Sequence, residues 1–191
     1  EDKRVDEQTS GLNLAQTYNP DIPKRFIAFQ KDSVTFNSFT PKITLEYAPR
    51  DHLFLFATWS KGLKSGGYNL GSATAPFKPE KLTDYEAGIK ADWLDGRLRT
   101  NLTGFYYDYS NLQVQKLIEQ VIQVVNAASA KIKGAELEVI AQPVDGLRLE
   151  VNASWLDSEY RDFRPGVPGR PEVGEIDLWG NRLSQAPRYT I

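Results

Sequence analysis

The sequence predicts an all-β protein, built as an antiparallel, up-and-down sheet that forms a segment of a transmembrane β-barrel. Three observations predict it: apolar and polar residues alternate strictly, short and long connections alternate, and aromatic residues recur at fixed distances from the short turns. Along residues 83–93, for example, Tyr85 and Ala87 alternate with Asp84 and Glu86. No segment shows a sustained helical period, so we expect almost no helix.

The predicted strands follow one another along the chain, and each shows the period of two that is typical of a sheet with one apolar and one polar face. They cover residues 43–47, 51–59, 83–93, the stretch from the turn at residues 95–96 to about 109, 131–142 and 147–155. One more strand is expected at the extreme N-terminus, and another begins at Tyr189. The total is about seven to eight strands.

The connections between these strands are of two kinds. Three are tight turns, at residues 48–51, 95–96 and 143–146, and an Asp-Gly pair between alternating segments is a strong hairpin signal. Three are long and rich in glycine, proline and charge, at about residues 7–33, 61–82 and 157–187. Short turns at one end and long loops at the other are typical of outer-membrane barrels.

Aromatic residues are expected at two levels, as in barrels whose tyrosines and tryptophans lie at both membrane interfaces. Tyr47 and Trp93 lie beside the tight turns. Three of the predicted strands, at residues 51–59, from the turn at 95–96 to about 109, and at 147–155, are about eight to ten residues long, close to the 9–11 residues with which a tilted strand crosses a bilayer. The level near the long loops comprises Trp59, Phe105, Tyr106, Tyr107, Tyr109 and Trp155.

Composition excludes several classes of function. The formal charge of −2 leaves no broad basic surface for nucleic acid, and the absence of cysteine excludes disulfides and thiolate metal sites. His52 is the only histidine, so a zinc site is not expected, and no catalytic set is present. Glu136 and Glu138 share one face of a strand, which can serve acid–base chemistry; we expect them to line a wet lumen opposite cations such as Arg148.

Several motifs, in order along the chain, resemble those of TonB-dependent outer-membrane receptors. They are residues 59–69 (WSKGLKSGGYN), 77–80 (FKPE), 85–90 (YEAGIK), 104–109 (GFYYDY), 112–114 (LQV), 126–128 (NAA), 134–138 (GAELE), 180–183 (GNRL) and 186–187 (AP). The resemblance covers roughly residues 40–191. Each motif alone is weak, but their order and spacing together are specific.

The resemblance implies a 22-stranded barrel in the outer membrane of a Gram-negative bacterium, with an N-terminal plug in its lumen. It implies import of a scarce nutrient, such as a ferric siderophore, cobalamin or carbohydrate, driven by a TonB-type periplasmic protein through the plug. Residues 1–191 would then be a later part of the barrel domain, with the plug and the C-terminal strands outside this chain. The expected partners are outer-membrane lipid, the energy-coupling protein and a small-molecule substrate, with no cofactor and no enzymatic activity.

Because the family binds substrate between extracellular loops and the plug, the ligand contacts are expected on the long loops. Cations there can meet an anionic iron chelate, and aromatic rings can stack on it. The candidates are Lys61, Lys64, Tyr68, Arg161, Arg164, Trp179 and Arg182.

Two other interpretations remain open from the residues alone. A closed eight-stranded barrel with a structural or adhesive role fits the length. A soluble β-sandwich that binds, for example, carbohydrate has the same alternation, and it would place Leu137, Val139, Leu149 and Val151 inside a dry, two-layer interior.

Overall fold

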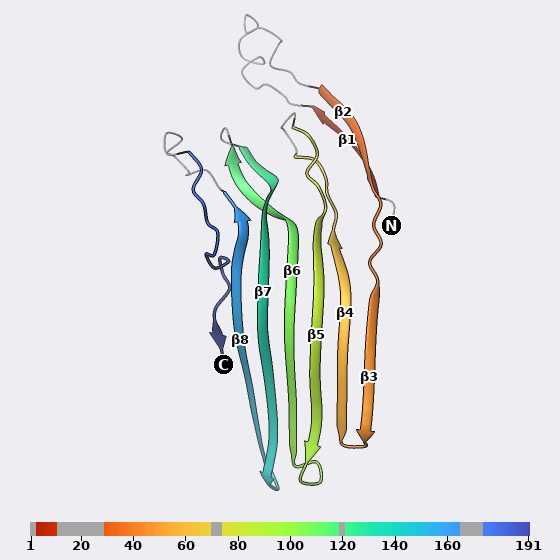
Figure 1. The fold of residues 1–191 in the computed structure, drawn as a ribbon, viewed down its shortest axis with the longest axis vertical. Helices are drawn as coiled ribbons and strands as arrows, with labels where there is room; N and C mark the ends of the chain where they lie inside the picture. The colour runs from red at the N-terminus through yellow and green to blue at the C-terminus, as the bar shows by residue number, and fades with distance from the viewer. Residues whose placement is uncertain (1–2, 11–28, 70–73, 119–120, 165–173) are drawn as a thin grey trace, which may run out of the picture.

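The computed structural model describes residues 3–10, 29–69, 74–118, 121–164 and 174–191. Within these ranges every regular element is a β-strand (Figure 1). The strands are β1 (Lys3–Ser10), β2 (Phe29–Phe36), β3 (Lys42–Arg50), β4 (Leu53–Lys64), β5 (Glu80–Trp93), β6 (Leu98–Ile118), β7 (Val121–Val144), β8 (Leu147–Phe163) and β9 (Tyr189–Thr190). None of the described residues forms a helix that could cross a membrane.

Strands β3 to β9 form one seven-stranded sheet in which each strand pairs antiparallel with the next along the chain. This confirms the predicted up-and-down topology. Strands β1 and β2 form a separate hairpin, so part of the predicted loop at 7–33 is strand, and residues 11–28 lie outside the described residues. Because β3 and β9 do not pair, the described sheet is open, and the closed eight-stranded barrel is wrong.

The three tight turns lie at the same end of the sheet, as predicted (Figure 1). The turn between β5 and β6 places Leu94, Asp95 and Gly96 at φ values of 56°, 54° and 84°, and Gly146 between β7 and β8 has a φ of 82°. Glycine adopts this left-handed region without the steric penalty that a side chain brings. The Asp-Gly pairs therefore bend the chain where the sequence indicated.

The strands are longer than predicted. Strand β6 has 21 residues, β7 has 24 and β8 has 17, against about ten, twelve and nine in the predicted ranges. Strands β4 and β8 continue to Lys64 and Phe163, inside segments predicted to be loops. The sheet therefore extends beyond the upper aromatic level, and the register of β6 against β7 shifts between Tyr109 and Leu112, where Asn111 has a φ of 54°.

The pairing register assigns each side chain to one of two faces, because side chains alternate along a strand and partners share a face. One face, called here the outward face, is apolar over the lower two-thirds of the sheet. One row of partners across it runs through Tyr47, Leu55, Ile89, Leu102 and Leu137. The next row runs through Leu45, Ala57, Ala87, Gly104 and Ala135.

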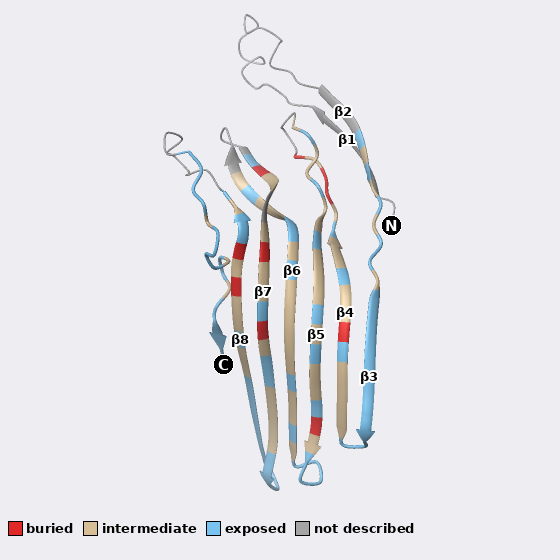
Figure 2. Cartoon of the chain, viewed as in Figure 1, coloured by how far each residue is buried: buried red, intermediate tan, exposed pale blue. Residues whose placement is uncertain are grey.

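This outward face has no protein layer against it. Leu45 is 72% exposed and Val151 52%, and β3 is exposed along its whole length (Figure 2). The buried hydrophobic residues among those described are only Ala91, Ala130 and Tyr160. Leu137, Leu149 and Val151 lie on this exposed face, so the two-layer sandwich is wrong for the described residues, and the apolar surface requires an apolar solvent such as lipid.

An aromatic row bounds the apolar area on the side of the long loops. Trp59, Tyr85 and Tyr106 are consecutive register partners, and Trp155 pairs with Tyr189 further along the sheet. Phe105, Tyr107 and Tyr109, predicted at the same level, instead have the parity of the opposite, inner face. On strand β5, Tyr85 and Trp93 are eight residues apart, about 26 Å along the strand, which matches an apolar band of about 25 Å.

Candidate functional site

The inner face carries the polar residues that alternate with the outward apolar ones. Ser60 Oγ donates a hydrogen bond to Asp84 Oδ2 at 3.0 Å, and Tyr107 Oη donates to Glu86 Oε1 at 3.1 Å. These pairs cross from strand to strand, so the carboxylates are held in place by neutral donors. The inner face therefore carries hydrogen-bonded carboxylates rather than a packed apolar core.

The predicted pairing of Glu136 and Glu138 with Arg148 is wrong. Glu138 accepts a hydrogen bond from Asn101 Nδ2, and its partner on β8 is Asn152, whereas Glu136 lies between Thr103 and Ser154. Arg148 lies close to the tight turn and pairs with Glu150 at 3.2 Å. Counting residues outward from the turn at residues 145–146 already places Glu138 near Asn152, and that signal was available in the sequence.

At the opposite end from the tight turns, the connection between β4 and β5 is folded back on itself. Gly67 and Phe77 exchange two backbone hydrogen bonds, of 3.1 and 2.8 Å. A Cβ at Gly66 would meet the Phe77 carbonyl oxygen at 2.3 Å, so this close approach requires glycine. The glycines of the motif at 59–69 thus form the base of the loop.

Side-chain amides fasten this loop to the hairpin of β6 and β7. Asn69 Nδ2 donates to the Val124 carbonyl oxygen at 2.9 Å, and the Val124 amide donates back to Asn69 Oδ1 at 2.7 Å. Asn126 exchanges a similar pair with the backbone of Lys78. Gln113 Nε2 donates to the Ser65 carbonyl oxygen at 2.9 Å. We call these three side chains, Asn69, Gln113 and Asn126, the amide strap.

The amide strap brings together motifs that lie far apart in the sequence. Asn69 belongs to the motif at 59–69, Lys78 to that at 77–80, Gln113 to that at 112–114 and Asn126 to that at 126–128. Sequence reasoning identified these motifs but not the contacts between them, because the partners are 48 to 55 residues apart.

Segment 174–188 packs along the edge of β8. The Leu178 amide donates to the Phe163 carbonyl oxygen at 2.9 Å, and the Tyr160 amide donates to the Asn181 carbonyl oxygen at 2.8 Å. Leu178 and Leu183 pack against the buried pair Ala130 and Tyr160. This cluster also contains Tyr109, beyond the aromatic row; burial raises the pKa of its phenol, and the carboxylates of Glu80 and Asp84 add to the shift.

The seven predicted ligand residues lie in three places. Lys61 and Arg161 have the parity of the outward face; Lys61 Nζ lies 5.7 Å from the centre of the Trp59 ring, and Arg161 pairs with Glu159. Lys64 ends β4, and Tyr68 lies in the loop beside the amide strap.

The other three predicted ligand residues belong to the end of β8 and the segment packed on it. Arg164 lies 3.7 Å from Asp177, and the exposed Trp179 donates its amide to the same carboxylate at 2.9 Å. Arg182 Nη2 donates to the carbonyl oxygens of Leu156 and Ala186, at 3.2 and 3.1 Å. The structure therefore brings Arg164 and the Trp179 backbone to the same Asp177 carboxylate and engages Arg182 with the backbone, and it does not gather all seven around one point. That they bind a ligand remains a prediction.

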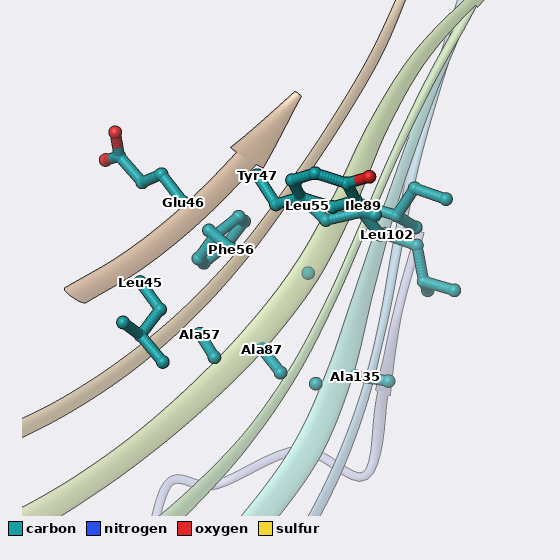
Figure 3. A pocket seen from close by; sticks show the side chains of 12 residues that line it. Leu45, Glu46, Tyr47, Leu55, Phe56, Ala57, Ala87, Ile89, Leu102 and Ala135 are labelled. Carbon is teal, nitrogen blue, oxygen red and sulfur yellow. The ribbon is translucent and has the colours of Figure 1, made fainter. Parts of the chain in front are cut away.

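Metal-binding residues do not converge in the described part of the chain: no group of three or more histidine, cysteine, aspartate or glutamate side chains is placed to hold an ion. The described residues are thus arranged as a wall with a rim of loops. Its outward face is apolar, with Leu45, Ala57 and Leu102 among the side chains that line a hollow in it (Figure 3). Its inner face carries hydrogen-bonded polar and charged side chains.

Comparisons with known proteins agree with this geometry. The family described as "TonB dependent receptor-like, beta-barrel" matches residues 7–191. The metal-pseudopaline receptor CntO of Pseudomonas aeruginosa (strain UCBPP-PA14) is 33% identical over 125 residues, which are 65% of this chain and 17% of that protein. The chain thus spans about a sixth of the length of this curated relative.

Solved structures show the same fold. The ferric yersiniabactin uptake receptor FyuA from Yersinia pestis superposes with a TM-score of 0.66 at 21% identity, over 85% of this chain and 23% of that one. The siderophore receptor PiuA from Acinetobacter baumannii gives a TM-score of 0.67 at 18% identity, over 88% and 25% of the two chains. Because the family match covers almost the whole chain, the chain belongs to the TonB-dependent receptors, a family of transporters in the outer membrane of Gram-negative bacteria.

Proposed function

We propose that residues 1–191 form part of the wall of a single barrel domain, of the 22-stranded kind, in an outer-membrane active transporter that imports a metal chelated by a siderophore or a related metallophore. The observation that carries this proposal is the two-faced sheet. Its exposed apolar face, with Leu45 at 72% and Val151 at 52%, suits lipid, and its inner face carries hydrogen-bonded carboxylates suited to a water-filled bore.

The names of similar proteins support the substrate class. CntO is a receptor for metal-pseudopaline, FyuA takes up ferric yersiniabactin, and PiuA is a siderophore receptor. All three names refer to metal chelates or their carriers. They favour a chelated metal over cobalamin or carbohydrate as the substrate of this chain.

In the proposed cycle the loop rim captures the substrate, and the wall excludes it from the lipid. The amide strap positions Tyr68, and Asp177 holds both the Arg164 cation and the backbone amide of the exposed Trp179, so this part of the rim offers a cation and an indole ring to an anionic, aromatic chelate. Lys64 and Arg182 are the other candidates on the rim. A TonB-type periplasmic protein would then displace a plug in the bore and release the substrate inward.

Uptake by cells that carry the full-length receptor tests the proposal. A strain that lacks its own siderophore receptors would express the receptor and be offered radiolabelled iron on a panel of siderophores, nickel and zinc metallophore complexes, labelled cobalamin and a labelled oligosaccharide. We expect at least one metal chelate to accumulate, and the accumulation to stop when the TonB-type protein is deleted. Accumulation of cobalamin or oligosaccharide alone would contradict the substrate class, and uptake that persists without the TonB-type protein would contradict the energy source.

A further inference from the structure

The upper part of the β6–β7 hairpin, residues 112–118 and 121–128, lies between two groups of predicted ligand residues (Figure 1). We call this part the upper hairpin. Tyr68 belongs to the connection between β4 and β5 on one side of it. Arg164 and Trp179 belong to the end of β8 and to the segment packed on β8, on the other side. The upper hairpin carries none of the seven predicted ligand residues, and its place between them makes it a candidate support for both groups.

On the side of the β4–β5 connection, two side chains of the upper hairpin hold the backbone of the loop. Gln113 Nε2 donates hydrogen bonds to the carbonyl oxygens of Ser65 and Lys78, at 2.9 and 3.2 Å. Asn126 Oδ1 accepts from the Lys78 amide at 2.5 Å, and Asn126 Nδ2 donates to the Lys78 carbonyl oxygen at 2.8 Å. Ser65 follows β4 and Lys78 lies just before β5, so the segment that carries Tyr68 is fastened at both ends.

On the side of β8, a polar and an apolar contact attach the upper hairpin. Lys116 Nζ donates to the Arg164 carbonyl oxygen at 3.4 Å. Leu112 packs against the buried pair Ala130 and Tyr160, which belong to β7 and β8. The upper hairpin is therefore joined to the end of β8 as well as to the β4–β5 connection.

The same buried pair supports the segment that carries Trp179. Leu178, the residue before Trp179, packs against this pair, and its amide donates to the Phe163 carbonyl oxygen at 2.9 Å. Phe163 ends β8 and precedes Arg164, and its side chain packs in the same cluster. The upper hairpin and the segment with Trp179 therefore rest on one apolar cluster.

We propose that the upper hairpin is the positioning element of the loop rim, which sets the separation between Tyr68 on one side and Arg164 and Trp179 on the other. This inference rests on the proposed function, because the separation matters for binding only if both groups contact one metal chelate. A rim that is held in place before binding loses less conformational entropy when the chelate binds. The side chains of the upper hairpin thus act on affinity through their neighbours and need no contact with the chelate.

Uptake kinetics of two double variants of the full-length receptor test the positioning role. Q113A/N126A detaches the upper hairpin from the β4–β5 connection, and L112A/K116A weakens its attachment to β8. The probes are the radiolabelled metal chelates of the uptake panel. We expect each variant to raise the half-saturation concentration of a transported chelate about tenfold, because binding must then also order the rim, and to leave the maximal rate per receptor unchanged.

Electron paramagnetic resonance measures the separation of the two groups without any substrate. Spin labels are attached through Ala75→Cys in the β4–β5 connection and Ser184→Cys in the segment on β8, both exposed positions in a sequence that contains no cysteine. The matched control is Q115A/I122A, which truncates two exposed side chains of the upper hairpin. We expect a narrow distance distribution in the wild type and in this control, and a broader one in both detaching variants.

The positioning role is wrong if either detaching variant keeps the narrow distance distribution of the wild type. It is also wrong if the variants lower the maximal rate and leave the half-saturation concentration unchanged, because misfolded receptor has that effect. A broad distribution in Q115A/I122A would mean that truncating any side chain of the upper hairpin loosens the rim. If the wild type transports none of the chelates, the proposed function fails, while the distance distributions still decide whether the upper hairpin holds the rim.

Discussion

Gly134 illustrates how single residues shape the inner face. It is the register partner of Phe105 on β6, and the Phe105 ring occupies the space where a side chain would be. A Cβ at Gly134 would lie 2.5 Å from Phe105 Cζ and 2.5 Å from the Trp155 carbonyl oxygen. Gly88 is covered by Phe56 in the same manner. Aromatic rings thus fill the gaps that glycines leave in this single-layer sheet.

We expect Gly134→Ala to lower the free energy of unfolding of the full-length receptor by about 1–3 kcal/mol, because the ring and a backbone carbonyl must both move. Gly104→Ala is the matched control, since its Cβ would meet no atom closer than 3.9 Å. Urea unfolding in detergent micelles, followed by tryptophan fluorescence, measures the difference. Equal stability of the two variants would show that the Phe105 ring has room to turn aside.

The face of the sheet on which a side chain lies is the feature that the sequence predicts best. Period two requires no knowledge of the partner strand, so the faces of Tyr85, Glu86 and Glu138 follow from the sequence alone. The level of a residue does not follow, because it depends on register. Distance from the tight turn alone groups Phe105 and Tyr107 with Tyr106, although alternation already places their stacked rings, with centroids 4.7 Å apart, on the other face.

Among the elements, the hairpin of β6 and β7 depends most on contacts distant in sequence. Beyond the bulge at Asn111, apolar and polar residues alternate only from Leu112 to Gln115, which is too short a run to have predicted a strand, although β6 continues to Ile118. The amide strap supplies part of the hydrogen bonding of this backbone. The Asn69 side chain donates to the Val124 carbonyl oxygen and accepts from the Val124 amide, the two bonds that a neighbouring strand would otherwise form. Such pairing cannot be derived from local pattern, because a loop and not a strand supplies the donors and acceptors.

Asn69→Ala should release the upper hairpin without unfolding the wall. The Val124 amide then loses its acceptor, and we expect its hydrogen exchange in the full-length receptor to become about ten to a hundred times faster, as follows from losing about 1–3 kcal/mol locally. Asn152→Ala, an exposed amide on the inner face of β8, is the control and should leave the exchange of Val124 unchanged. Exchange that is equally slow in both variants would mean that the strap does not hold this element.

At the scale of the whole molecule, the two faces of the sheet carry the argument for an outer-membrane wall. Leu102 is 46% exposed, and it lies on β6 four residues from Tyr106 and four from Leu98, in the middle of the apolar band. Thr103, its neighbour along the chain, has the opposite parity and lies between Gly88 and Glu136 on the inner face. Substitutions at these two adjacent positions therefore compare the lipid-facing side with the bore-facing side of the wall at the same depth in the membrane.

We expect Leu102→Arg to lower the unfolding free energy of the full-length receptor in phospholipid vesicles by about 2–4 kcal/mol, the cost of a cation at mid-depth on a lipid-facing strand. Thr103→Arg places the same cation beside Glu136 in water and should cost less than about 1 kcal/mol. Guanidine titration of vesicle-inserted receptor measures both values, and the amount of each variant in the outer membrane provides an independent measure. If Thr103→Arg is the more damaging of the two, the outward and inner faces of the sheet are assigned the wrong way round.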